Sequence, residues 1–500
     1  PLPCLYAVSM DPHSSSDTLA YASVAELTRD LSAGVLTSHA LVSALLARIE
    51  AIDAPASAVA LRSIIAVADD ALRIARERDE ERARGQIRGP LHGIPVLVKD
   101  NIEALGLPGT AGSLALVDAT VTADAPVVAK LREAGAIILA ATNCSEWANM
   151  RSGASTSGWS AVGGLTSNPW ALDRSAGGSS SGSGAALAAG LAPLALGTET
   201  DGSIVCPSAV NGVVGLKPTV GALPVTGIVP ISHSQDTPGP MGRCVADVAA
   251  MWSVLCGQGV AIRTTTDVRI GVVPQWNSGR SHTDALFARV VEELASSGVF
   301  EHVREVDVPA MEAEHHEDEY TVLLAELHDD MAHYLGTRRP GARVRTLADI
   351  VQFNLAHHDH ELAHFGQEHF ELAVSRGGVT QASLTALERN QHWAREICLD
   401  PALREADVLI APTYAPAWKH DFVLGHPNIG GAVTSPAAVA GYPLLSLPIG
   451  LVQGLPVGLT IVGRPNAEDL MLSVATAIER VLMLDSEGTW RPNFVAPTRG

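Results

Sequence analysis

The chain has 500 residues, of which 47% are hydrophobic and 18% are charged, and it contains 45 glycines and 30 prolines. This composition excludes a disordered chain and is typical of a globular protein with many turns and a large core. The formal charge of −20 argues against nucleic acid or an anionic membrane as the main partner, because either favours a basic patch. We expect a small molecule or a short peptide instead.

The cysteines and the apolar runs narrow the class further. No Cys-x-x-Cys pair occurs, so neither zinc nor a disulfide framework is indicated. No apolar run reaches the about 18 residues that a membrane-spanning helix needs. We expect a soluble, cytoplasmic protein with reduced, mostly buried thiols. The six cysteines are Cys4, Cys144, Cys206, Cys244, Cys256 and Cys398.

The N-terminal part is expected to be helical after a short irregular end. Residues 1–18 lack the basic start and apolar stretch of a secretory signal and begin without methionine. We expect this end to be loosely ordered, and either processed or left over from expression. Ser23 and Glu26 then form a capping box, and apolar residues recur at one-turn spacing over 41–49 after Thr37.

The next segments predict a strand, helix, strand unit. The runs IPVLVKD (94–100) and AIILAATN (136–143) are short and apolar, and the helical pattern APVVAKLREAG (125–135) separates them. This alternation is typical of neighbouring strands in a largely parallel sheet.

A Gly/Ser-rich loop, GGSSSGSG (177–184), comes next. We predict a helix from about Gly184 to Gly190 and an extended apolar run to Gly197. Further on, the stretch 444–464 predicts two strands joined near Gln453 and Gly454, and a helix follows from about Asn466.

Between residues 300 and 400, His, Glu and Asp crowd helical patterns such as TVLLAELHDDMAHYL. We expect this region to form a helical cap or insertion. The whole pattern predicts an α/β fold with a mixed, many-stranded sheet flanked by helices.

Three explanations compete for the Gly/Ser loop. A flexible linker is not normally followed at once by a helix and a buried strand. A phosphate cradle requires GxxxxGK[ST] or a complete GxGxxG, and neither is present. Residues 178–182 match the GxSxG elbow that would make Ser180 a nucleophile, but the preceding NPWALDRSAGG is polar and lacks the apolar strand that the elbow needs.

Lys99 is a candidate base. It follows the apolar run IPVLV, so its amine is expected at the end of a buried strand. Burial disfavours the ammonium form and lowers the pKa, which makes a lysine able to accept a proton near neutral pH. Alternatively, Lys99 is a structural lysine at a strand edge that pairs with Asp100.

Several long stretches resemble the amidase signature family. They are GPLHGIPVLVKDNIE, GGSSSGSGAALAAG, GTETDGSIVCPSAVNGVVGLKPT, SQDTPGPM, GYPLLSLPIGL and GLPVGLTIVGR, which span roughly residues 20 to 480. The resemblance implies one amidase signature domain over residues 19–498, with the helical cap at about 300–400 inside it. It also implies hydrolysis of a linear amide bond without a cofactor or a metal.

In that family a lysine, a serine in a cis peptide and a nucleophilic serine form a proton relay, with the two serines 24 positions apart. Ser203 and Ser179 have this spacing. The resemblance therefore implies that Ser203 is the nucleophile, Ser179 the proton shuttle and Lys99 the base. The oxyanion hole would consist of backbone N–H groups at residues 200–203, which are Thr200, Asp201, Gly202 and Ser203.

One departure from the common family pattern lies at Asp201, where most members have glycine. The peptide amidase branch, which removes the C-terminal amide of peptides, has a similar ETDGSI, and NCSEWANMRS (143–152) and HFGQE (364–368) also resemble that branch. We expect peptide C-terminal amides or other small acyl amides as substrates. Aryl acylamides and carbamates are the alternatives within the family, and an amidotransferase A-type subunit is a third interpretation.

The remaining site residues are expectations from that resemblance. Substrate-binding candidates are Trp147, Met150, Arg151 and Ser155, of which Trp147 and Met150 equally fit a core role. Asp236 is expected to hold a loop near the site. Cys206 is expected to be a buried thiol and not a nucleophile.

The histidine-rich segment between residues 315 and 369 also invites a metal hypothesis. His357 with Glu361, and His360 with His364, repeat at one-turn spacing. No HExxH motif is present, and we expect a solvated acidic face without a metal. As partners we expect only the substrate, no nucleic acid and no membrane, with the protein a monomer or a homodimer.

Overall fold

The computed structural model describes residues 19–423, 430–483 and 491–494. The predicted irregular end at 1–18, with Cys4, lies outside these residues. Among the described helices, none combines the length and the apolar character that crossing a membrane requires.

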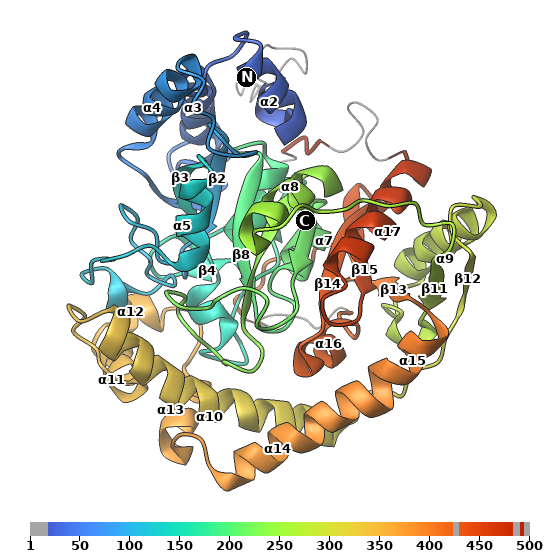
Figure 1. The fold of residues 1–500 in the computed structure, drawn as a ribbon. Helices are drawn as coiled ribbons and strands as arrows, with labels where there is room; N and C mark the ends of the chain where they lie inside the picture. Colours follow the sequence, from blue (N-terminus) through green and yellow to red (C-terminus); the bar gives the residue numbers. More distant parts are fainter. Residues whose placement is uncertain (1–18, 424–429, 484–490, 495–500) are drawn as a thin grey trace, which may run out of the picture.

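A mixed sheet of eleven strands forms the centre of the molecule (Figure 1). This confirms the predicted fold class. In spatial order the strands are β1 (Ile64–Val67), β3 (Ile137–Thr142), β2 (Pro95–Lys99), β8 (Leu194–Glu199), β10 (Thr237–Gly242), β9 (Val214–Lys217), β14 (Leu444–Val452), β15 (Leu455–Val462), β13 (Val408–Pro412), β11 (Arg269–Val272) and β12 (His302–Glu305).

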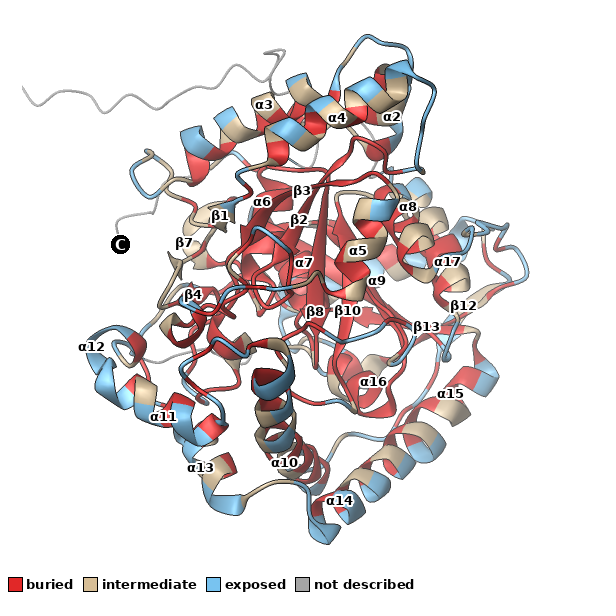
Figure 2. Ribbon diagram, turned by 60° about the vertical axis from the view of Figure 1, so that its left-hand side comes forward, coloured by how far each residue is buried: buried red, intermediate tan, exposed pale blue. Residues whose placement is uncertain are grey.

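The central strands are buried along their whole length, as Figure 2 shows. Strand β2 runs parallel to β3 and to β8, and α5 (Pro126–Glu133) connects β2 to β3 as the sequence predicts. Continuous apolar runs suit such strands, because helices cover both faces of the sheet. The carboxyl ends of β2 and β8 therefore lie at the same edge.

The predicted pair of C-terminal strands is confirmed as the antiparallel hairpin β14–β15. Gln453 and Gly454 connect the strands with φ of +52° and +78°. Positive φ at both turn residues is what a tight two-residue hairpin turn requires, since its twist then matches that of the strands.

Helices cover both faces of the sheet (Figures 1 and 2). Helices α6 and α7 pack on one face, and α5, α8 and α17 pack on the other. The helices outside the segment 313–405 are α2 (Val24–Ser32), α3 (Ser38–Arg48), α4 (Ala71–Ala83), α5, α6 (Ser181–Ala188), α7 (Val205–Asn211), α8 (Val245–Cys256), α9 (Ser281–Ser296), α16 (Thr434–Ala440) and α17 (Glu468–Val481). The capping box of Ser23 and Glu26 starts α2 as predicted.

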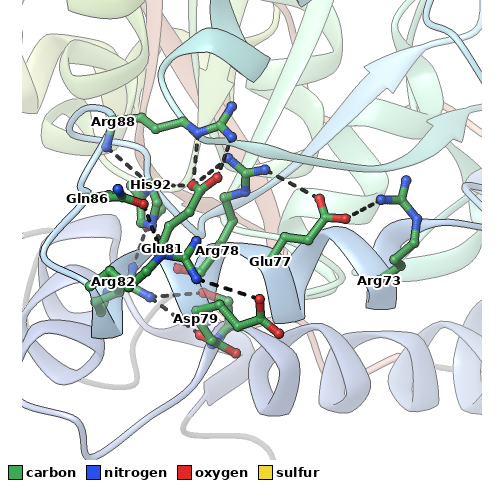
Figure 3. Close-up of polar contacts among 12 residues, drawn as sticks. Arg73, Glu77, Arg78, Asp79, Glu81, Arg82, Gln86, Arg88 and His92 are labelled. Carbon is green, nitrogen blue, oxygen red and sulfur yellow. Dashed lines mark hydrogen bonds and ion pairs between the residues drawn. The ribbon is translucent and has the colours of Figure 1, made fainter.

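An ion-pair network holds α4 against the chain that leads into β2 (Figure 3). Arg78 donates to Glu81 at 2.8 Å, and Arg88 pairs with the same carboxylate. Arg82 donates to the carbonyl oxygen of His92 at 2.7 Å, and the His92 ring lies 3.0 Å from the carbonyl oxygen of Arg78. These contacts fix the start of β2, at whose other end Lys99 lies.

The segment 313–405 is helical and lies across one edge of the sheet (Figure 1). Its helices are α10 (Ala313–Arg338), α11 (Leu347–Ala356), α12 (His358–Glu361), α13 (Glu368–Arg376), α14 (Gln381–His392) and α15 (Asp400–Glu405), with a π-helical stretch at Trp393–Leu399. The residues His302–Glu305, which fall within the range expected to be a cap, instead form β12 of the main sheet. Half of this edge strand is exposed to solvent, so its sequence is polar and does not show the pattern of a buried strand.

Candidate active site

Lys99 ends β2 and is completely buried. Its Nζ lies 2.8 Å from Oγ of Ser179, 2.8 Å from Oγ1 of Thr198 and 3.3 Å from the carbonyl oxygen of Thr198. Asp100 accepts instead from the backbone N–H groups of Gly109 and Thr110, at 3.0 Å each. The alternative of a Lys99–Asp100 pair is therefore wrong.

Burial lowers the pKa of Lys99 to about 8. The charges of Cys144, Asp236 and Glu199 act in the opposite direction and favour the ammonium form, but burial dominates. About a tenth of the amine is thus neutral at pH 7, far more than for an ordinary lysine. A neutral amine has two N–H donors for the two oxygens of Thr198 and one lone pair for a proton from Ser179.

Ser179 is buried in the Gly/Ser loop, directly before α6. The peptide bond from Gly178 to Ser179 is cis. The N–H of Ser145 donates to the carbonyl oxygen of Ser179 at 3.0 Å, and a Cβ at residue 178 would lie 2.3 Å from Oγ of Ser145. The loop therefore needs glycine at this position, and Ser145 fixes its orientation.

Ser180 lies beside this site, but its hydroxyl bonds to the backbone of Thr198 and not to the amine of Lys99. Its hydroxyl donates to the carbonyl oxygen of Thr198 at 3.1 Å and accepts from the Thr198 N–H at 3.3 Å. The side chain is buried and committed to the backbone of β8. This geometry agrees with our rejection of a GxSxG elbow centred on Ser180.

Ser203 lies between β8 and α7, and 8% of its surface is exposed. The N–H of Ser180 donates to the carbonyl oxygen of Ser203 at 3.1 Å, which ties the two serine-bearing segments together. Gly202 before it has a φ of +78°, which glycine adopts without strain. Within the described residues, the N–H groups of Asp201, Gly202 and Ser203 have no hydrogen-bond acceptor and remain available to a ligand.

Glu199 and Asp236 hold the two sides of this turn. Glu199 accepts from the N–H groups of Ile204 and Val205 at 2.7 and 2.9 Å. Asp236 accepts from the hydroxyl of Thr200 at 2.5 Å. Burial raises the pKa of Asp236 to about 6. Asp236 thus holds a loop beside the site, as the sequence predicts.

Two small adjoining cavities lie next to Asn101, and one of them also reaches Thr198 and Thr200, whereas Lys99, Ser179 and Ser203 line neither. They share Asn101, Ala148, Val229 and Ile231. The first is also lined by Ala111, Trp147, Pro230, Leu327, Met331 and Phe370, and the second by Thr198, Thr200, Val225, Ile228, Asp236 and Thr237. Asp236 is the one carboxylate in either lining, so the first cavity suits an uncharged, apolar group.

Of the four predicted substrate-binding residues, Trp147 lines a cavity. It has a φ of +47°, an unusual conformation for a bulky side chain, and it packs edge-on against Phe370. Met150 belongs to the same apolar cluster without lining either cavity. Arg151 and Ser155 are buried outside the cavities, and the Nε of Arg151 lies 2.9 Å from a carboxylate oxygen of Glu146.

The cysteines behave as expected where they are described. The five described cysteines are free, and Cys206 is buried. Burial raises the pKa of Cys206 to about 12, so its thiol stays protonated at neutral pH. Cys206 is therefore a poor nucleophile.

The expected solvated acidic face is wrong for part of the segment 315–369. Asp318, Glu319 and Glu361 are buried. Glu361 accepts from the hydroxyl of Ser113 at 3.0 Å and from the N–H of Leu114 at 2.7 Å. Glu361, and Glu319 through Gln235, fasten the helical segment to the main body, whereas Asp318 pairs with Arg389 of α14.

We expect no metal here, and one cluster that joins His233 to two carboxylates of that segment bears on the question. His233 has Nδ1 2.9 Å from a carboxylate oxygen of Asp330 and Nε2 3.3 Å from one of Glu326. Because its two ring nitrogens face different carboxylates, the imidazolium itself supplies the positive charge between them. The geometry favours an ion-pair cluster over a metal centre.

Sequence reasoning missed the residues that orient the lysine. Thr198 provides two of the three oxygens around Nζ, and Asn101 donates to the same Thr198 hydroxyl at 3.0 Å. Both residues lie within stretches that carry the family resemblance, KDN and LGTETDGS. Their positions at the ends of two predicted strands could have indicated that they lie near Lys99.

Comparisons with known proteins identify the family. A family model described as Amidase matches residues 40–472. A peptide amidase from Stenotrophomonas maltophilia is 42% identical with a TM-score of 0.86, covering 93% of this chain and 98% of that one. An amidase family protein from Bacillus anthracis is 28% identical with a TM-score of 0.81, covering 94% and 92%. The A-type subunit of glutamyl-tRNA(Gln) amidotransferase from Symbiobacterium thermophilum is 34% identical over 92% of this chain and 96% of its own length. The chain belongs to the amidase family, with the amidase signature motifs, and is an amide-hydrolysing enzyme.

Proposed function

We propose that the protein hydrolyses C-terminal amides of short peptides through an acyl-enzyme on Ser203. The observation that carries this proposal is the contact of 2.8 Å between the buried Nζ of Lys99 and the hydroxyl of Ser179. A base of pKa about 8 next to a hydroxyl is the arrangement that activates a serine relay.

In the proposed acylation, neutral Lys99 accepts the proton of the Ser179 hydroxyl, and Ser179 accepts the proton of Ser203. The Ser203 oxygen attacks the amide carbonyl carbon and forms a tetrahedral intermediate. The free N–H groups of residues 201–203 donate to its oxyanion, where one such donor typically lowers the barrier by about 3 kcal/mol.

Collapse of the intermediate breaks the carbon–nitrogen bond. The relay runs in reverse and delivers the proton from Lys99 through Ser179 to the leaving amine. Water then attacks the ester of Ser203, with its proton again taken by the relay, and the acid and the free hydroxyl are released. Proton count and charge balance over the cycle without a further reactant.

The choice of peptide amides is supported by the 42% identity to a peptide amidase over nearly the full length of both chains. The apolar cavity lined by Trp147 and Phe370 adjoins the cavity that Thr200 lines, which is consistent with a neutral group near the scissile bond. Aryl acylamides and carbamates stay as alternative substrates, because an apolar lining also suits an aryl group.

An amidotransferase A-type subunit is the second candidate, favoured by the 34% identity to the Symbiobacterium thermophilum protein. That role requires partner chains, whereas we propose a monomer or a homodimer in the cytoplasm. Hydrolysis of an amide by the purified chain, together with its mass in solution, separates the two.

A substrate panel tests the proposal. Peptide amides, anilides and carbamates of matched acyl group are compared by kcat/KM, with Ser203→Ala as the blank. We expect peptide amides to be the best class and the variant to fall by about 10⁴-fold or more. If anilides or carbamates exceed peptide amides tenfold, the substrate assignment is wrong while the hydrolase assignment stands.

A further inference from the structure

The loop Ile231–Asp236 lies between the Ser203 turn and α10. On one side, Asp236 accepts from the hydroxyl of Thr200 at 2.5 Å and from the N–H groups of Ile231 and Ser232 at 2.8 and 3.0 Å. The position of Thr200 is therefore set by the conformation of this loop.

On its other side the loop is bound to buried carboxylates of α10. Glu326, which is 3% exposed, accepts from the hydroxyls of Ser232 and Ser234 at 2.5 and 2.9 Å. Gln235 donates to Glu319 at 3.0 Å. Because buried carboxylates need such partners, the loop and the helix hold each other in register.

His233 completes this contact through both ring nitrogens. Nδ1 lies 2.9 Å from Asp330 and Nε2 lies 3.3 Å from Glu326, and the His233 backbone N–H also donates to Asp330 at 3.0 Å. Both nitrogens carry a proton only in the imidazolium form. A neutral ring would direct one lone pair at a carboxylate, which repels it.

The charges around His233 favour the cation. Burial alone lowers the pKa of His233, but the hydrogen bond to Asp330 and the negative charges of Glu326, Asp330 and Asp236 raise it above its ordinary value. Asp329 of α10 also interacts electrostatically with the His233 ring. The imidazolium is thus favoured below this raised pKa and is lost as the pH rises through it.

We propose that cationic His233 is a positioning residue that latches the loop 231–236 to α10 and thereby aligns Thr200 with the oxyanion turn. The proposal rests on the function proposed above, since it takes residues 201–203, which follow Thr200, as the oxyanion hole. The same latch shapes the cavity, because Ile231 of the loop and Met331 of α10 both line it.

The test is the pH profile of kcat/KM for a peptide amide in three variants. His233→Asn removes the charge, and His233→Lys keeps a cation up to high pH. His392→Asn is the matched control, because the His392 side chain is also 57% exposed and also pairs with a carboxylate, that of Glu396, far from the loop in sequence. The activity of the wild type is divided by that of each variant at each pH.

For His233→Asn we expect the wild type to be about fivefold more active at pH 6, and we expect this ratio to fall towards one by pH 9 as His233 loses its proton. His233→Lys should be as active as the wild type at pH 6 and more active at pH 9. The control variant His392→Asn should be as active as the wild type at every pH. A ratio for His233→Asn that is the same at both pH values would overturn the latch, as would full activity of this variant at pH 6.

Asp330→Asn provides an independent check, because it removes the partner of Nδ1 and should reproduce the pH-dependent loss. Failure of the proposed function can be told apart from failure of the latch. If the proposed function is wrong, Ser203 of the wild type is not acylated. A wild type that acylates Ser203 with a pH-independent His233→Asn ratio refutes the latch alone.

Discussion

Lys99 and Lys217 occupy similar places in the fold and have different surroundings. Each is the last residue of a buried strand, β2 or β9, and each is completely buried. Burial lowers the pKa of both to about 8, against the opposing charges of nearby carboxylates. A lowered pKa by itself therefore does not single out the catalytic base.

The partners of the two amines differ. Nζ of Lys99 contacts the hydroxyls of Ser179 and Thr198, at 2.8 Å each. Nζ of Lys217 donates to the carbonyl oxygens of Tyr442 and Pro218, at 2.9 and 3.4 Å. A carbonyl oxygen cannot give up a proton, so only Lys99 has a neighbour from which a neutral amine can take one.

Replacing each lysine by methionine separates the two roles most strongly. Lys99→Met should lower kcat by about 10³-fold or more, because general-base assistance and the relay are lost together. Lys217→Met should keep kcat within about threefold. Steady-state kinetics on a peptide amide measures both, and an equal loss in the two variants would contradict separate roles for the two lysines.

Lys217 should appear instead in the pH dependence of stability. Its pKa is about 8 in the folded protein, against an ordinary value of 10.5 in the unfolded chain, so the unfolded chain binds more protons between these values. The free energy of unfolding of the wild type should therefore rise by about 2 to 3 kcal/mol relative to Lys217→Met between pH 7 and pH 10.5.

Urea unfolding at several pH values measures this difference. The contribution of Lys99 to the pH dependence is the same in both proteins and cancels in the difference. A gap between wild type and Lys217→Met that does not change with pH would show that Lys217 has an ordinary pKa. Burial would then not explain the lowered pKa of either lysine.

The sequence predicts the strands and the chemistry best where local patterns are strong. The apolar runs 94–100 and 136–143 and the Gln453–Gly454 turn give β2, β3 and the β14–β15 hairpin. The three proposed relay residues follow from the family resemblance, because Lys99 and Ser179 are 80 positions apart and no local pattern joins them.

The parts that escaped prediction depend on contacts between distant segments. Glu326 and Ser232 are 94 positions apart, and no local pattern shows that a carboxylate of an acidic helix is buried against a loop. The strand His302–Glu305 escaped because an edge strand with polar residues lacks an alternating pattern. The roles of Arg151 and Ser155 depend on how a loop packs, which composition does not determine.

The pH dependence of Ser203 acylation tests the central claim most directly. A slowly deacylating carbamate or ester is mixed with the enzyme between pH 6 and pH 9, and mass spectrometry locates and times the adduct. We predict a single adduct on Ser203 whose formation speeds up about tenfold per pH unit below about 8 and then levels off, as titration of Lys99 requires. An adduct on Ser180 or Cys206, or a rate that is flat across this range, would contradict the account.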